Sequence, residues 1–198
     1  IRRKTWHAAI LLFLVASAPW PLRTSWAQSC GQRPQDALWF VSARQCCRVS
    51  PGAVPELSIQ RCDRDSGWQP ADLHELYQPT TPDQIVVIYI HGNRVPSEEA
   101  ALEGQHVYRL LTAGVDDATP IRFVIWSWPS AQVQGQLRDV RTKADRTELA
   151  GYCLAWLLTH LPESQHVSLL GYSFGARIAT GAMHLVGGGE LSGRLLPH

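Results

Sequence analysis

The motif GYSFG at positions 171–175 constrains the fold of this 198-residue chain more than any other feature. It follows a short apolar run, residues 166–170, and precedes residues 177–186, whose pattern predicts a helix that ends at glycines. A serine at a strand-to-helix turn of this kind is held in a strained backbone conformation with its hydroxyl exposed. We therefore predict that Ser173 is a nucleophile. Only small residues allow strand and helix to approach at the two flanking positions, which are Gly171 and Gly175.

The rest of the chain alternates strand patterns with helical patterns. Apolar and β-branched runs predict strands at 37–42, 57–62, 84–90, 121–128 and 166–170, and amphipathic spacing predicts helices at 97–111, 136–161 and 177–186. Residues 63–83 contain three prolines, so we expect a surface connection there that can include one helical turn. With 45% hydrophobic residues the chain can bury one core. This order predicts a mostly parallel α/β sheet with helices on both faces.

The first residues resemble an export signal. Basic residues 2–4 precede the apolar run 8–19, and Ser25-Trp26-Ala27 suits a signal peptidase. The run is too short to cross a membrane core of about 30 Å, so we expect no stable span after cleavage. We predict a signal peptide at 1–27, a domain at 28–198, and an exported protein in the periplasm, at the cell surface or outside the cell. Lipid anchoring through Cys30 is a weaker alternative.

Charge and cysteine content exclude several classes of partner. Eighteen Lys and Arg nearly balance seventeen Asp and Glu without a basic cluster, so we expect no nucleic acid. Cys153 lies on the apolar side of a predicted helix and is expected to be a buried free thiol. An oxidising compartment would make disulfides of the other cysteines, whose spacing does not suit zinc. We expect up to two bridges, with connectivity left open, and no metal or other cofactor; the candidates are Cys30, Cys46, Cys47 and Cys62.

An oxyanion hole can be placed from the same pattern. One donor should be the backbone N–H of Phe174, directly after the nucleophile. The second should come from the loop after strand 84–90, where His91-Gly92-Asn93 lies, and we choose the Asn93 N–H. The less favoured alternative makes His91 the catalytic base. Trp126 and Trp128 share one face of a strand, which favours core packing over binding of carbohydrate or lipid.

These motifs, together with Trp126-Ser127-Trp128-Pro129-Ser130, resemble the α/β-hydrolase superfamily, and within it a bacterial group of uncharacterised substrate. The resemblance covers about residues 84–190. It implies acyl transfer to Ser173, with hydrolysis of an ester, amide or thioester of a small-molecule or acyl substrate. It also implies that an acid and then a histidine follow the serine on later loops.

The chain departs from that pattern at its end. Only Glu190 and His198 follow Ser173 in the required order, and no further strand carries them; His184 lies on the helix after the motif. We therefore expect the N-terminal part of the fold, truncated after that helix, with the acid and base beyond His198. The alternative is a non-catalytic secreted or surface binding protein on the same scaffold. Arg177 should have an acidic partner, and contact with an anionic substrate is the less favoured alternative.

Overall fold

The computed structural model describes residues 31–46, 53–78, 81, 83–114, 118–131 and 136–196. These form one six-stranded sheet in the order β3-β2-β1-β5-β4-β6. The predicted signal peptide, Cys30, Cys47 and His198 lie outside the described residues. The strands are β1 (Ala37–Ser42), β2 (Ser58–Asp63), β3 (Gly67–Ala71), β4 (Ile85–Ile90), β5 (Ile121–Ser127) and β6 (Val167–Gly171). The helices are α1 (Leu73–Tyr77), α2 (Ser97–Thr112), α3 (Gln136–His160) and α4 (Phe174–Val186).

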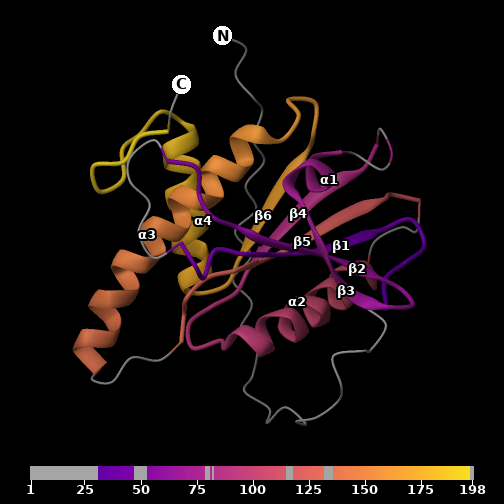
Figure 1. Ribbon diagram of the computed structural model, residues 1–198, viewed down its shortest axis with the longest axis horizontal. Helices are drawn as coiled ribbons and strands as arrows, with labels where there is room; N and C mark the ends of the chain where they lie inside the picture. Colours follow the sequence, from indigo (N-terminus) through magenta and orange to yellow (C-terminus); the bar gives the residue numbers. More distant parts are fainter. Residues whose placement is uncertain are drawn as a thin grey trace.

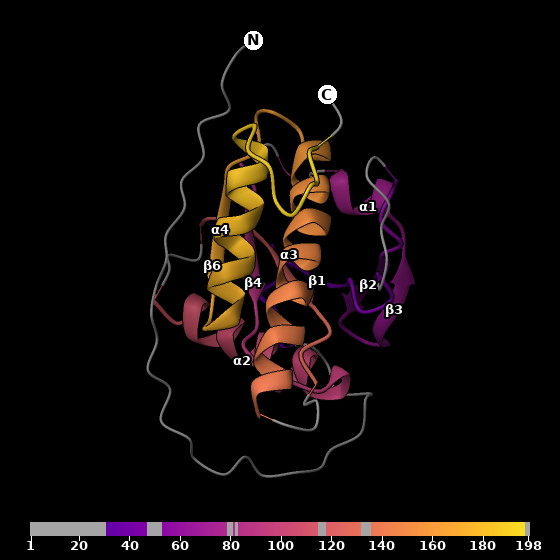
Figure 2. The ribbon, with the colours of Figure 1, turned by 90° about the vertical axis from the view of Figure 1, so that its left-hand side faces the viewer.

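The predicted α/β architecture is confirmed. Strands β1, β5, β4 and β6 run parallel, whereas β2 and β3 form an antiparallel extension at one edge. Figures 1 and 2 show α3 and α4 side by side over one face of the sheet, with α2 on the opposite face. Parallel strands covered in this way are mostly apolar on both faces: β4 is a continuous hydrophobic run, and β5 is one apart from Arg122 and Ser127.

The core therefore has two layers, and β5 contributes to both. Val124 and Trp126 point toward α3 and α4 in the larger layer, and Phe123 and Ile125 pack with α2 in the smaller one. This alternation leaves β5 fully buried along its whole length. The carboxyl ends of β4, β5 and β6 consequently meet at one edge of the sheet, above a rigid core.

The prediction of a surface connection at 63–83 missed strand β3, whereas the short helix α1 agrees with the helical turn expected there. A tight turn joins β2 to β3, in which Asp63 Oδ1 accepts hydrogen bonds from the backbone N–H groups of Asp65 (3.0 Å) and Ser66 (2.9 Å). Pro70 is tolerated because β3 pairs only with β2 among the described strands. Asp72 caps α1 through the Glu75 N–H at 2.8 Å.

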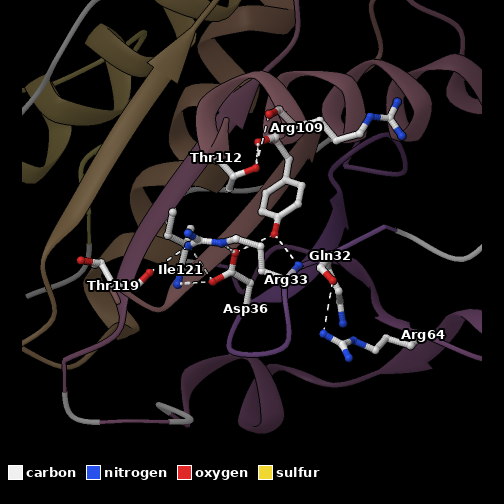
Figure 3. Close-up of polar contacts among 9 residues, drawn as sticks. Gln32, Arg33, Asp36, Arg64, Arg109, Thr112, Thr119 and Ile121 are labelled. Atoms are coloured by element: carbon white, nitrogen blue, oxygen red, sulfur yellow. Dashed lines mark hydrogen bonds and ion pairs between the residues drawn. The ribbon is translucent and has the colours of Figure 1, made fainter. Parts of the chain in front are cut away.

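A buried carboxylate, Asp36, joins elements at the amino-terminal edge of the sheet (Figure 3). Its oxygens accept from Ile121 N–H at 2.8 Å, from Tyr108 Oη at 2.6 Å and from Arg33 Nε at 2.7 Å. Arg33 also donates to the carbonyl of Thr119 at 2.9 Å. Because Asp36 directly precedes β1, one side chain holds the start of β1 against the start of β5 and against α2.

The cysteines agree only in part with expectation. Cys62 is disulfide-bonded, and its partner lies outside the described residues. Cys46, expected to be a bridge candidate, is a free buried thiol that donates to the Glu56 carbonyl at 2.8 Å. Cys153 is free and buried as predicted. Within the described ranges, no helix combines the length and the apolar character needed to cross a membrane.

Candidate active site

Ser173 occupies the turn between β6 and α4, at the carboxyl edge of the sheet. Its backbone has φ 52° and ψ −117°, a combination that a residue with a side chain rarely adopts. Two short-range bonds close the turn, from Gly175 N–H to the Tyr172 carbonyl at 2.7 Å and from Ala176 N–H to the Ser173 carbonyl at 3.0 Å. The Tyr172 N–H donates to the Ile90 carbonyl at 3.0 Å, which ties the turn to β4. The serine side chain is left exposed.

The two glycines of the motif are sterically required. A Cβ on Gly175 would lie 2.1 Å from the Ile90 carbonyl oxygen, and a Cβ on Gly171 would lie 2.6 Å from the Ala176 nitrogen. Both clashes are with backbone, which no side-chain rotation relieves. The glycines therefore let α4 begin directly against the ends of β4 and β6.

The two backbone N–H groups chosen for the oxyanion hole are uncommitted in the described part of the chain. The Phe174 N–H belongs to the first turn of α4, where helix geometry provides no acceptor. The Asn93 N–H lies in the loop after β4, and no described acceptor takes it. The next residue, Arg94, has φ 60° and uses its own N–H on the Ser130 carbonyl at 3.0 Å. Both positions chosen for an oxyanion hole thus have available donors; that role remains a prediction.

His91 is fully buried, and both of its ring nitrogens have hydrogen-bond partners within the protein. Its Nδ1 lies 2.9 Å from the Gly92 carbonyl, and its Nε2 accepts from the Trp128 backbone N–H at 3.2 Å. These partners assign the proton to Nδ1 of a neutral ring. Burial lowers the pKa of His91 to about 3, and the nearby Arg44 charge lowers it as well, while the Gly92 bond opposes the shift. A ring so held is not free to take a proton from Ser173.

The bond from His91 to Gly92 also orients the next N–H group. The Gly92 carbonyl and the Asn93 N–H belong to one planar trans peptide and point in opposite directions. Holding the carbonyl on His91 therefore directs the Asn93 N–H away from the buried ring. On the outer side, the Tyr172 ring packs so closely that a Cβ on Gly92 would lie 2.7 Å from it.

Two further residues hold the loop, and sequence reasoning did not identify them. Ser130 Oγ accepts from the Val95 N–H at 3.1 Å and donates to the Val95 carbonyl at 2.9 Å. Arg44 donates to that carbonyl at 2.9 Å and to Ser127 Oγ at 2.7 Å. Burial lowers the pKa of the Arg44 guanidinium, although the Glu98 charge opposes this. Arg44 comes from the turn after β1, and no local motif marks it.

A half-buried carboxyl, Glu103, pairs with a buried tyrosine on the α2 side of β4. Tyr89 Oη donates to Glu103 Oε1. Burial raises the pKa of the Glu103 carboxyl; the Tyr89 bond opposes that shift and Glu99 adds to it. Burial also raises the pKa of Tyr89, so the phenol keeps its proton.

The remaining candidates have partners other than Ser173. His184 Nε2 is 3.2 Å from the Glu190 carbonyl, so these two predicted candidates contact each other. Arg177 faces α3, where it bonds Thr147 Oγ1 at 3.0 Å and its expected acidic partner Glu148 at 3.3 Å. Among the described residues, none hydrogen-bonds to Ser173 Oγ. Within the same residues, no group of three His, Cys, Asp or Glu side chains could hold a metal ion.

Comparison with known proteins gives one family. The sequence model described as "Alpha/beta hydrolase of unknown function (DUF900)" matches residues 71–188. This range runs from the end of β3 to just beyond α4 and includes the Ser173 turn, the Asn93 loop and the Trp128 turn. No curated protein and no solved structure matches the chain.

Proposed function

Because the chain belongs to the DUF900 family of α/β-hydrolases of unknown function, we propose that it is a serine hydrolase acting on a carboxylic ester or a related acyl compound. The observation that carries the proposal is the backbone of Ser173, an exposed serine held at φ 52° between two sterically required glycines. Such strain costs about 1–3 kcal/mol and persists where the surrounding structure enforces it. Sites that store strain in this way are commonly functional.

In the proposed reaction, Ser173 Oγ adds to the carbonyl carbon while its proton passes to a base. Collapse of the tetrahedral intermediate breaks the bond to the leaving group, which takes that proton, and an acyl-enzyme remains. Water then releases the acid and restores the hydroxyl. A histidine and an acidic residue from outside the described residues supply the base and its partner. The neutral ring of His91 is not used.

The Phe174 and Asn93 N–H groups bind the developing oxyanion in this scheme. Both are backbone donors, so their directions are set before substrate arrives, and no reorganisation is needed during reaction. Removing one such donor in other enzymes lowers kcat by about 10²–10³-fold. The proposal needs no cofactor. The proposal also includes export, with cleavage of the signal peptide after Ala27. The mass of the secreted protein tests this, and the mass of the uncleaved chain would contradict it.

Reaction with a fluorophosphonate probe tests the nucleophile. Phosphonylation forms an Oγ–P bond and expels fluoride, so we expect stoichiometric labelling of the full chain and none in Ser173→Ala. Ser192→Ala is a matched control, because Ser192 is also exposed and has φ 50°. It should label like the wild type. Labelling that persists in Ser173→Ala would exclude Ser173 as the nucleophile.

A second function has one observation in its favour. Since the described residues offer Ser173 Oγ no hydrogen-bond partner, a non-catalytic binding protein on the same scaffold is the alternative. The two functions give opposite results with the same probe. A binding protein would leave Ser173 no more reactive than Ser192, whereas a hydrolase would label at Ser173 alone.

A further inference from the structure

We propose that Trp128 is a positioning residue that holds the two oxyanion donors in register, because its side chain contacts the segments that carry both. This inference rests on the proposed function, since it assigns a role within that site. Trp128 follows β5 and is fully buried. The Asn93 N–H lies in the loop after β4, and the Phe174 N–H lies at the start of α4. Because Trp128 contacts both of these segments, we infer that it fixes their relative position.

On one side, Trp128 holds His91 by three contacts. Its indole Nε1 donates to the His91 carbonyl at 2.9 Å, and its backbone N–H donates to His91 Nε2 at 3.2 Å. The two rings stack with centroids 5.8 Å apart and planes 16° apart. His91 in turn holds the Gly92 carbonyl, which directs the Asn93 N–H through the shared peptide plane. The position of the indole is thereby transmitted to the first donor.

On the other side, Trp128 packs against Phe174. The ring centroids lie 6.3 Å apart and the planes are tilted by 31°. Phe174 is the first residue of α4, so the same residue carries the ring that Trp128 touches and the second donor N–H. An aromatic contact of this kind restricts the rotation of the first turn of the helix. One rigid, two-ring side chain thus contacts both Phe174, which carries one donor, and His91, two residues before the other donor.

The indole hydrogen bond to His91 distinguishes Trp128 from the nearby tryptophan, Trp126. Trp126 lies two residues earlier on the same face and is fully buried as well. Its indole Nε1 has no hydrogen-bond partner in the part of the chain that the structure describes. Trp126→Phe therefore removes similar buried volume without breaking a hydrogen bond, which makes it the matched control for Trp128→Phe.

The test compares the second-order rate of Ser173 phosphonylation in both variants, with kcat and KM for p-nitrophenyl butyrate. We expect Trp128→Phe to lower the phosphonylation rate and kcat by about 10–100-fold. This is less than the effect of deleting a donor, because a displaced donor still stabilises the oxyanion in part. KM should stay within about twofold, since an oxyanion exists only in the transition state. Trp126→Phe should keep wild-type rates. A merely structural role would lower the labelled fraction and leave the rate constants unchanged.

A second variant keeps the proposal testable if Trp128→Phe does not fold. Phe174→Leu retains the backbone donor and removes only the ring contact on a half-buried residue, so its phosphonylation rate should fall several-fold. Wild-type rates in whichever of these two variants folds, or an equal loss in Trp126→Phe, would overturn the inference.

Amide hydrogen exchange reports on the loop independently of reactivity. The N–H groups of Arg94 and Val95 are bonded to Ser130, beside Trp128. We expect their exchange to accelerate about tenfold in Trp128→Phe and to stay unchanged in Trp126→Phe. A wild-type protein that does not label at Ser173 contradicts the proposed function alone, and the exchange measurement then decides the positioning role. Unchanged exchange in Trp128→Phe rejects that role in either case.

Discussion

At the scale of single residues, the strained turn is the part of the site that local sequence predicts best. Ser173, Gly171 and Gly175 were placed from a five-residue pattern because the geometry of the turn depends on the covalent chain and on the two strand ends beside it. Arg44 and Ser130 were not predicted. They reach the Asn93 loop from segments distant in sequence, so only the folded structure brings them to Val95.

Gly175→Ala tests how far the turn depends on close backbone approach. A Cβ placed 2.1 Å from the Ile90 carbonyl oxygen forces strand and helix apart, and we expect a loss of about 3 kcal/mol in the free energy of unfolding. Gly114→Ala is the control, since among the described residues no atom beyond its chain neighbours lies within 4 Å of its Cβ position. It should change stability by no more than about 1 kcal/mol. Urea unfolding measures both, and equal stabilities would refute the steric argument.

At the scale of elements, β3 is the strand that the sequence did not predict. The apolar runs of β4 and β5 and the repeat in α3 extend over enough residues to distinguish strand from helix. Strand β3 contains a proline, which indicated a connection instead, and α1 was expected only as a helical turn. Arg122 stabilises this region from β5 by donating to the carbonyls of Leu76 and Gln78. That contact is tertiary and leaves no local signal.

The joint at Asp36 gives a prediction at this scale. Asp36→Asn replaces the acceptor of bonds from Arg33 and Tyr108, and bonds to a charged acceptor are the stronger kind. We expect it to cost about 2–3 kcal/mol, against about 1–2 kcal/mol for Tyr108→Phe, which removes only the hydroxyl. Urea unfolding gives both values. Ser173 phosphonylation should be unchanged in both variants; a slower rate would show that the joint also shapes the site.

At the scale of the whole molecule, the alternation of strands and helices was enough to predict the α/β class. It did not predict the strand order, nor that β2 runs opposite to the other strands and pairs antiparallel with both β1 and β3. The order is set by how helices pack on the two faces, as the two core layers show. The local sequence pattern predicts whether a segment is a helix or a strand. Packing between distant elements determines where that segment lies in the fold.

Acid stability of the whole molecule should depend on His91. Its pKa is about 3 in the folded protein, below the usual value of 6.5, so below pH 6.5 the unfolded chain binds a proton that the folded one does not. Stability is therefore complete above pH 6.5 and falls as the pH drops toward 3, by up to about 1.4 kcal/mol per pH unit. Urea unfolding at several pH values should show a shallower slope in His91→Gln. An equal slope would mean that His91 titrates normally.

The Asp36 joint and the Ser173 turn lie at opposite ends of the same parallel strands. Mutations that reshape the loops at the carboxyl edge leave the joint that holds the strands together untouched. In the proposed hydrolase, changes of substrate range would therefore leave this part of the scaffold's stability intact. A library at this edge spares the fold only if it leaves out the residues that hold the loops, which are Arg44, His91, Gly92, Trp128, Ser130 and the glycines of the Ser173 turn.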